Sequence, residues 1–146
     1  MSDRSIPQDM LDDRGRVVGY HSGSTILTRG DLKPFLHLGN IAQARMRSGR
    51  ELTRIVARTG PVARLVDRNE NSWSENRLRP LLRKGMDWAV YLNRTEGIGL
   101  EEFEEARRRH ARFDEVSDAL FRRLVPSARD SLILLDPALV IEIGPA

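Results

Sequence analysis

The tripeptide Thr59-Gly60-Pro61 is the strongest local signal in this 146-residue sequence. Glycine followed by proline interrupts regular structure, and proline suits the first position of a helix, where its missing N–H has no partner. Residues 50–59 and 61–71 both carry apolar side chains at helical spacing. The pattern therefore predicts two helices joined by a tight turn, a helix-turn-helix.

The segment that follows is predicted to be a β-hairpin. Its strands would be Leu78–Leu82 and Trp88–Leu92, with residues 83–87 at the tip. A helix is the alternative interpretation, and Pro80 and Gly85 count against it. Helix, turn, helix and basic hairpin follow one another in the order of a winged helix-turn-helix.

The residues before the helix-turn-helix predict one clear helix and one ambiguous segment. Thr28 is a plausible N-cap for a helix through residue 46, which Gly39 would bend or interrupt. Residues 9–21 fit a short helix, and a hairpin over 16–28 is the competing interpretation. Residues 1–8 are expected to form a mobile tail.

The C-terminal part predicts a long helix that ends before Pro126. Apolar residues recur there in steps of three and four, as in the contact face of a coiled coil. About 40 Å of helix at ~1.5 Å per residue is long for a small domain, so we expect a second subunit to pack on it. Residues 131–135 are expected to be helical, and residues 138–143 are left undecided. The expected dimerisation residues are Phe103, His110, Phe113, Leu120 and Leu124.

Charge is unevenly distributed along the chain, although the total is only +3. Residues 40–94 carry twelve basic and five acidic side chains, whereas residues 95–146 carry seven and eleven. A basic middle segment suggests a polyanionic partner. Arg64 and Arg68 would lie on one face of the second helix, and Thr59 at its start could hold a phosphate. The full set of expected DNA contacts is Thr59, Pro61, Arg64, Arg68, Asn71, Arg83 and Lys84.

Composition excludes several other classes of protein. The chain has no cysteine, which rules out disulfides, thiolate metal sites and thiol redox sensing. Its apolar runs are far shorter than the ~20 residues of a membrane span, and its first residues lack the apolar core of a signal peptide. We therefore expect one cytoplasmic domain over residues 9–146, without a membrane partner.

Four segments together resemble the MarR family of winged-helix transcriptional regulators. They are ILTRGDLKPFLHLG, ELTRIVARTGPVARLVDRNE, DWAVYLNRTEG and EEARRRHARFDEVSDALFRRLVPSARDSLILL. The resemblance implies a mainly α fold with a small β-hairpin wing: a DNA-binding lobe over 44–94, and a dimerisation region over 9–43 and 98–146. It also implies a homodimeric, repressor-like regulator of pseudo-palindromic double-stranded DNA, released by a small aromatic or anionic effector.

Other functions are kept as alternatives. A winged-helix-derived module that binds a protein partner is the first, and an enzyme that needs no cofactor is a distant second. The sequence shows no phosphate-binding glycine loop, nucleophile elbow or HExxH motif, so no enzyme, metal or cofactor is expected. His21, His37 and His110 are far apart, and His37 is a minor candidate for an effector ligand. Trp73 and Trp88 are expected in the core, although an aromatic effector would suit such neighbours.

Overall fold

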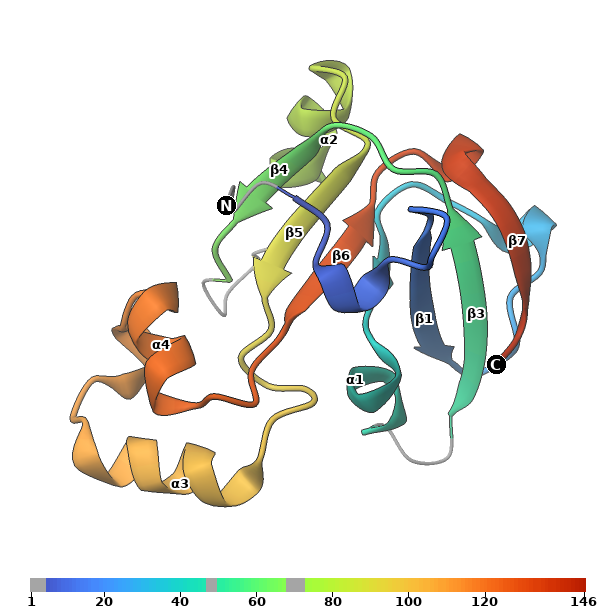
Figure 1. The fold of residues 1–146 in the computed structure, drawn as a ribbon. Helices are drawn as coiled ribbons and strands as arrows, with labels where there is room; N and C mark the ends of the chain where they lie inside the picture. Colours follow the sequence, from blue (N-terminus) through green and yellow to red (C-terminus); the bar gives the residue numbers. More distant parts are fainter. Residues whose placement is uncertain (1–4, 47–49, 68–72) are drawn as a thin grey trace.

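The computed structural model describes residues 5–46, 50–67 and 73–146, and within these ranges seven strands form two sheets (Figure 1). The first sheet is antiparallel in the order β1-β3-β7, and the second is mixed in the order β2-β6-β5-β4. The protein is a mixed α/β fold, so the predicted mainly α winged-helix architecture is wrong. The strands are β1 Val17–Gly23, β2 Leu36–Leu38, β3 Glu51–Ala57, β4 Val62–Leu65, β5 Trp88–Leu92, β6 Asp130–Leu134 and β7 Val140–Pro145.

The helices are short and lie outside the sheets. Helix α2 covers one end of the second sheet, and α3 and α4 lie together at its opposite end (Figure 1). No helix in the described part of the chain is long and apolar enough to cross a membrane. The α-helices are α1 Ile41–Arg45, α2 Glu75–Arg83, α3 Leu100–Arg109 and α4 Asp118–Leu124, and the 3-10 turns are Gln8–Met10, Arg29–Asp31, Phe113–Glu115 and Pro137–Leu139.

The residues predicted to form a helix-turn-helix instead contain two strands, β3 and β4, which belong to different sheets. Residues 50–59 contain β3, the central strand of the first sheet, where Ile55 and Val56 are both fully buried although they point to opposite faces. A central strand covered on both sides reads as a continuous apolar run, which a short sequence cannot distinguish from a buried helix. The turn at Gly60 is real, but it leads from β3 into β4.

The predicted hairpin is half correct. Trp88–Leu92 forms the strand β5 and every residue in it is buried, which confirms this part of the prediction. Leu78–Leu82 lies inside α2, so the alternative interpretation as a helix holds there. Pro80 lies within this short helix, at an exposed position. Strand β5 instead pairs with β4 in parallel and with β6 in antiparallel orientation.

The predicted helix from Thr28 is divided into three pieces. Thr28 does cap a helical turn, through a capping box with Asp31, but the turn is a single 3-10 segment. Phe35 then adopts a left-handed backbone conformation with φ 68°, and β2 follows it. Helix α1 begins after Gly39, where a break was expected.

The N-terminal residues differ from both interpretations offered for them. Strand β1 pairs with β3, more than 25 residues away in the chain, so it is neither a helix nor one arm of a local hairpin. Ile6 is only 8% exposed and belongs to the main core, so the expected mobile tail does not include it.

The predicted long C-terminal helix is two helices that fold back on each other. The apolar face is real, but its residues contact one another within the chain: Phe103 packs edge-on against Phe113, and Phe113 stacks on Phe121 at 5.1 Å. We call residues 100–124 the helical unit. The expected helix over 131–135 is wrong, because these residues form most of the strand β6 and the bend after it. The undecided residues 138–143 end the 3-10 turn Pro137–Leu139 and begin β7.

The two sheets meet where β1 passes β2. A bridge pairs Tyr20 with Gly39, with backbone N···O distances of 2.9 and 3.0 Å in the two directions. Gly19 permits this approach, because a Cβ atom there would lie 2.9 Å from the Cβ of Leu38. Residues of β1 from Tyr20 onward and residues of β2 together line a pocket next to this bridge.

Candidate functional site

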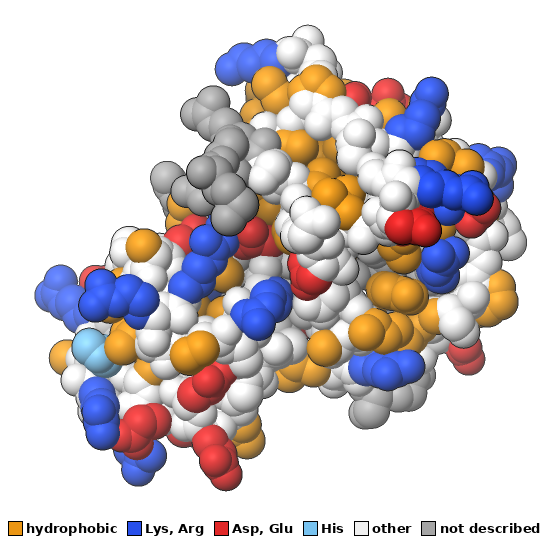
Figure 2. Space-filling view, viewed as in Figure 1, with side chains coloured by type: hydrophobic (Ala, Val, Ile, Leu, Met, Phe, Trp, Pro, Cys, Tyr) orange, Lys and Arg blue, Asp and Glu red, His pale blue; other side chains and the backbone are white. Residues whose placement is uncertain are grey.

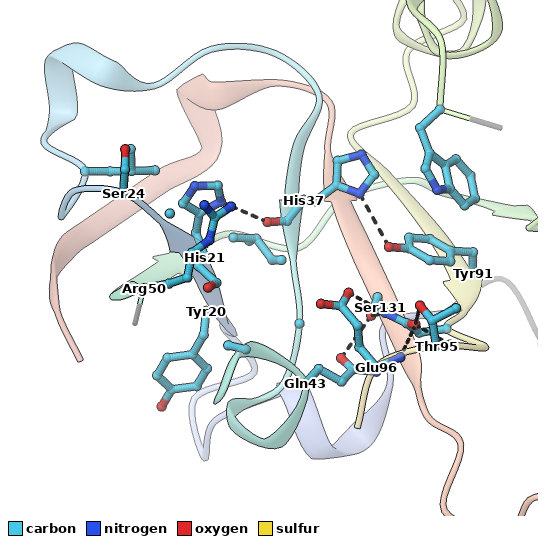
Figure 3. A pocket seen from close by; sticks show the side chains of 18 of the residues that line it. Tyr20, His21, Ser24, His37, Gln43, Arg50, Tyr91, Thr95, Glu96 and Ser131 are labelled. Atoms are coloured by element: carbon cyan, nitrogen blue, oxygen red, sulfur yellow. Dashed lines mark hydrogen bonds between the residues drawn. The ribbon is translucent and has the colours of Figure 1, made fainter. Parts of the chain in front are cut away.

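A pocket of about 670 Å³ lies at the junction of the two sheets. Its walls come from the end of β1 and the turn after it, from β2, from α1 and from the segment that follows β5. Figure 3 shows His21, Arg50 and Ser24 on one side, Tyr91 on the other, and Glu96 with Gln43 and Ser131 below. Its size and its mixture of aromatic and polar groups are typical of small-molecule sites.

The first wall of the pocket is formed by the end of β1. The Nδ1 atom of His21 lies 3.4 Å from the carbonyl oxygen of His37, which joins the first sheet to β2. Gly23 leaves room for this ring, because a Cβ atom there would lie 3.0 Å from its Nε2. The Oγ atom of Ser22 is buried and has no hydrogen-bond partner among the residues that the structure describes. A ligand in the pocket is one way to satisfy such a group.

The opposite wall is aromatic. The rings of Trp73 and Tyr91 lie 4.2 Å apart at an angle of 40°, and the imidazole of His37 meets both of them edge-on. The Nδ1 atom of His37 is 3.4 Å from the phenol oxygen of Tyr91. The guanidinium of Arg77 lies over the ring of Trp73, 5.3 Å from its centroid. These contacts form an aromatic shelf with a polar edge.

The floor of the pocket carries a carboxylate in a fixed position. Glu96 follows β5 by four residues, and the side-chain amide of Asn93 donates a 3.2 Å hydrogen bond to its Oε1. The backbone N–H of Glu96 donates to Oδ1 of the same Asn93 at 2.9 Å. Asn93 therefore holds both the backbone and the side chain of Glu96.

The pocket contains no assembled metal site. Among the residues that the structure describes, no three histidine or acidic side chains gather closely enough to hold a metal ion. What the pocket offers is two carboxylates, those of Glu96 and Asp67, two imidazoles, an aromatic shelf and the guanidinium of Arg50.

Arg64, the central residue of the predicted DNA contacts, is engaged within the protein. It lies in β4 and makes a two-pronged ion pair with Asp130, with both N···O distances 2.9 Å. It also lies 3.6 Å from Asp118 of α4, and its side chain is only 15% exposed. This guanidinium is therefore directed toward carboxylates of its own chain, and it does not lie on a recognition helix.

The other predicted DNA contacts are scattered. Thr59 and Pro61 lie in the β3–β4 connection, where the carbonyl of Pro61 accepts hydrogen bonds from the N–H groups of Asp87 and Trp88. Arg83 and Lys84 are exposed at the end of α2 rather than at a hairpin tip. Arg68 and Asn71 lie outside the described residues.

The predicted dimerisation residues belong mainly to the interior of the helical unit. Phe113 is buried, and Phe103 and Leu124 pack against the same apolar cluster. His110 ends α3 and is partly buried, as is Leu120 on α4. The surface of this unit alternates in charge in Figure 2, and exposed pairs such as Arg109 with Glu105 account for part of the pattern.

The sequence contained weak signals for the pocket. His37 and Trp73 were minor candidates for effector contacts, and both line the pocket, whereas Trp88 is fully buried in the core. Glu96 was not singled out. It follows a fully buried strand, and the ends of buried strands often carry ligand-binding residues.

Comparisons with known proteins found no match for this chain. No family model, no curated protein and no solved structure matches this chain. Nothing in these comparisons identifies a MarR protein, and the fold differs from the winged helix that the resemblance implied.

Proposed function

We propose that this protein is an enzyme that binds a nucleotide in the pocket between its sheets and acts on the N-glycosidic bond of that nucleotide. The observation that carries the proposal is the placement of Glu96. Its carboxylate is fixed by Asn93 on the floor of a pocket that has an aromatic shelf on one wall and polar groups on the other.

The aromatic shelf suits a flat ring. The rings of Tyr91 and Trp73 pack against each other at a tilt, and the imidazole of His37 meets both of them edge-on. Stacking of a nucleobase on such a side chain contributes about 1–3 kcal/mol of binding free energy. The polar atoms at the edge of the shelf offer hydrogen bonds to the ring substituents of a base.

The opposite wall suits the sugar and phosphate part of a nucleotide. Ser22, Ser24 and Thr25 bring hydroxyl groups to this wall, and Arg50 brings a positive charge to its rim. Hydroxyls both donate and accept hydrogen bonds, and a guanidinium matches the geometry of a phosphate. Glu96 lies below the space between this wall and the shelf, as Figure 3 shows.

A carboxylate in this position favours cleavage of a glycosidic bond. When the C–N bond breaks, its electron pair leaves with the base, and positive charge develops on the sugar, where a carboxylate stabilises it. Water or an acceptor nucleophile then adds to the anomeric carbon and releases a proton. NAD⁺ is the best substrate candidate, because its nicotinamide is cationic while attached and departs as a neutral base.

The earlier expectation of a DNA-binding homodimeric regulator, and of no enzymatic activity, stays a prediction. The contacts of Arg64 are the reason that we favour the pocket over a DNA interface. Duplex DNA belongs in the same experiment as a competing ligand.

Calorimetric titration of the purified chain with NAD⁺, ATP and AMP tests binding, and chromatography of released nicotinamide tests the reaction. We expect Trp73→Ala to weaken NAD⁺ binding by about 5- to 100-fold, because the stacking surface is lost. Glu96→Gln should keep binding within a few-fold and reduce nicotinamide release by about 100-fold or more.

The matched control is Glu101→Gln, which removes an exposed carboxylate from α3, away from the shelf and floor. It should leave both binding and turnover unchanged. Absence of binding by every nucleotide at millimolar concentration would refute the proposal. Binding of duplex DNA without binding of nucleotides would favour the regulator.

A further inference from the structure

Three neutral polar side chains are buried beneath the pocket. Gln43, Asn93 and Ser131 are 2%, 3% and 2% exposed. They come from three separate elements: α1, the end of β5, and β6. Polar groups are costly to bury unless they are hydrogen-bonded, so their arrangement indicates a specific role or a complete network.

The three side chains form one chain of hydrogen bonds that ends at Glu96. The hydroxyl of Ser131 donates to Oε1 of Gln43 at 2.9 Å. The amide of Asn93 donates one hydrogen to the hydroxyl of Ser131 at 3.0 Å and directs another to Glu96 Oε1 at 3.2 Å. Gln43 sets the direction of its bond with Ser131, because its amide nitrogen is committed to the carbonyl oxygen of Arg129 at 3.1 Å and its Oε1 is left to accept.

Asn93 has no spare acceptor through which the chain could reverse. Its Oδ1 already accepts hydrogen bonds from the N–H groups of Thr95 and Glu96, at 3.1 and 2.9 Å, and from the hydroxyl of Thr95. The amide nitrogen is therefore the only part of Asn93 that can reach toward Ser131 and the Glu96 carboxylate.

Helix α1 is built around Gln43. The side chain of Asn40 accepts a hydrogen bond from the Gln43 N–H, and Gln43 Oε1 accepts one from the Asn40 N–H, which forms a capping box. Two glycines admit the side chain: a Cβ atom on Gly39 would lie 2.7 Å from Gln43 Oε1, and one on Gly97 would lie 2.6 Å from its Cγ. Gly97 also has φ +72°, which favours glycine.

We infer that Gln43 and Ser131 are positioning residues for the Glu96 carboxylate, acting through Asn93. This inference rests on the proposed function of Glu96 and adds a remote determinant of its activity. Gln43 orients the hydroxyl of Ser131, Ser131 accepts a hydrogen bond from the Asn93 amide, and the same amide donates its other hydrogen to Glu96. Loss of Ser131 removes one of the two acceptors of the Asn93 amide nitrogen, and loss of Gln43 removes the acceptor that orients the Ser131 hydroxyl. Either change weakens the placement of the hydrogen bond from Asn93 to Glu96.

The test uses two variants that retain side-chain volume, Ser131→Ala and Gln43→Met, and their combination. With NAD⁺ as substrate, each single variant should lower kcat by about tenfold and change KM by less than about twofold, because the shelf and the other wall are unaffected. The double variant should be no worse than the poorer single variant, because both changes break the same chain. Ser131→Thr keeps the hydroxyl and should restore most of kcat.

The control for general destabilisation is Ser117→Ala. It removes the side chain that caps α4 by accepting a hydrogen bond from the Leu120 N–H, away from the pocket. This variant should be less stable than the wild type and have an unchanged kcat. A similar loss of kcat in Ser117→Ala would overturn the inference, because instability alone would then explain the effect.

A ligand-free measurement separates this inference from the proposed function. In nuclear magnetic resonance spectra, Ser131→Ala and Gln43→Met should both shift the side-chain amide signals of Asn93, and the Glu96 N–H should exchange at least about tenfold faster. If the wild type releases no nicotinamide, the proposed function fails and this measurement alone decides the positioning. Unchanged Asn93 signals and Glu96 exchange in both folded variants overturn it.

Discussion

The body of the molecule, meaning the two sheets with α1 and α2, buries neutral polar side chains, whereas its junction with the helical unit buries charged ones. Beneath the pocket the buried groups are amides and a hydroxyl, such as Gln43 and Ser131. At the junction, Arg94 is 7% exposed at its side chain and pairs with Asp118 at 2.8 Å. Arg64 and Arg122 add further contacts with Asp130.

The difference between neutral and charged buried groups corresponds to a difference in the role of the two regions. Neutral amides and hydroxyls hold a side chain in place through directional hydrogen bonds, which suits a site that acts on a ligand. Ion pairs instead join two separately packed parts. The guanidinium of Arg94 lies 4.9 Å from the ring centroid of Phe121 and also donates to the carbonyl oxygen of Val116, so it fastens the helical unit by charge, stacking and hydrogen bonding together.

The largest expected effect comes from the apolar centre of the helical unit. Phe121 is 1% exposed, and Phe121→Ala should lower the free energy of unfolding by about 3–5 kcal/mol in urea titrations. Leu100→Ala, at a residue 72% exposed, is the control and should change it by less than about 0.5 kcal/mol. A separate early transition in Phe121→Ala would show that the unit unfolds independently of the body, which would break the comparison.

The next effect concerns the ion pairs at the junction. Arg64→Ala leaves the carboxylates of Asp130 and Asp118 with less compensation, and we expect a loss of about 2–4 kcal/mol. Arg109→Ala breaks an exposed pair with Glu105 and should cost less than about 1 kcal/mol. Equal losses of unfolding free energy in Arg64→Ala and Arg109→Ala would contradict the view that the ion pairs at the junction contribute more because they are buried.

A smaller effect is expected in the body, where Gly60 meets Asp87. A Cβ atom on Gly60 would overlap the carboxylate of Asp87, so Gly60→Ala should destabilise the protein by about 1–3 kcal/mol. Gly144→Ala is the matched control, because nothing lies within 4 Å of its Cβ position. Thermal unfolding of the two variants side by side gives the comparison, and equal melting temperatures would refute the close contact.

The smallest expected effect is a dependence of stability on pH. Burial and the neighbouring Asp136 raise the pKa of Asp87 above 3.8, although Arg58 opposes the shift. A carboxyl group whose pKa is higher in the folded than in the unfolded protein stabilises the folded protein while it is protonated. This contribution is complete below the unfolded-state pKa and is lost as pH rises through the folded-state pKa. Asp87→Asn should therefore reduce the loss of stability as pH rises above 3.8 and stabilise the protein at pH 7, by less than about 1 kcal/mol because the group is only partly buried. Lower stability of this variant at pH 7 would contradict the sign.

Local signals in the sequence were reliable where they came from one residue or from a short, strongly apolar run. Thr28 caps a helical turn, chain direction changes at Gly60, and Trp88–Leu92 is a strand. Apolar spacing was less reliable. Residues 50–59 fit a helical face, yet β-branched residues in a central strand are buried on both sides and give the same pattern over so short a run.

The candidate site was visible only in fragments. His37 and Trp73 were noticed as minor candidates, but nothing in the sequence connects them to Glu96. Gln43, Asn93 and Ser131 are separated by 38 residues or more, and hydrogen bonds such as Ser131 to Gln43 join positions 88 residues apart. Such contacts exist only after β5 and β6 have paired.

The sequence by itself determined which side chains are available: many arginines, no cysteine, and apolar residues at 103, 106 and 113 that must be buried somewhere. The tertiary structure decided what buries them and what the arginines face. Apolar residues spaced three and four apart form one face of a helix that must be buried. This spacing does not say whether another subunit or a neighbouring helix buries that face. Arg64 carries the same charge on a helix or on a strand; only the pairing of β4 with β5, and of β5 with β6, places it beside Asp130.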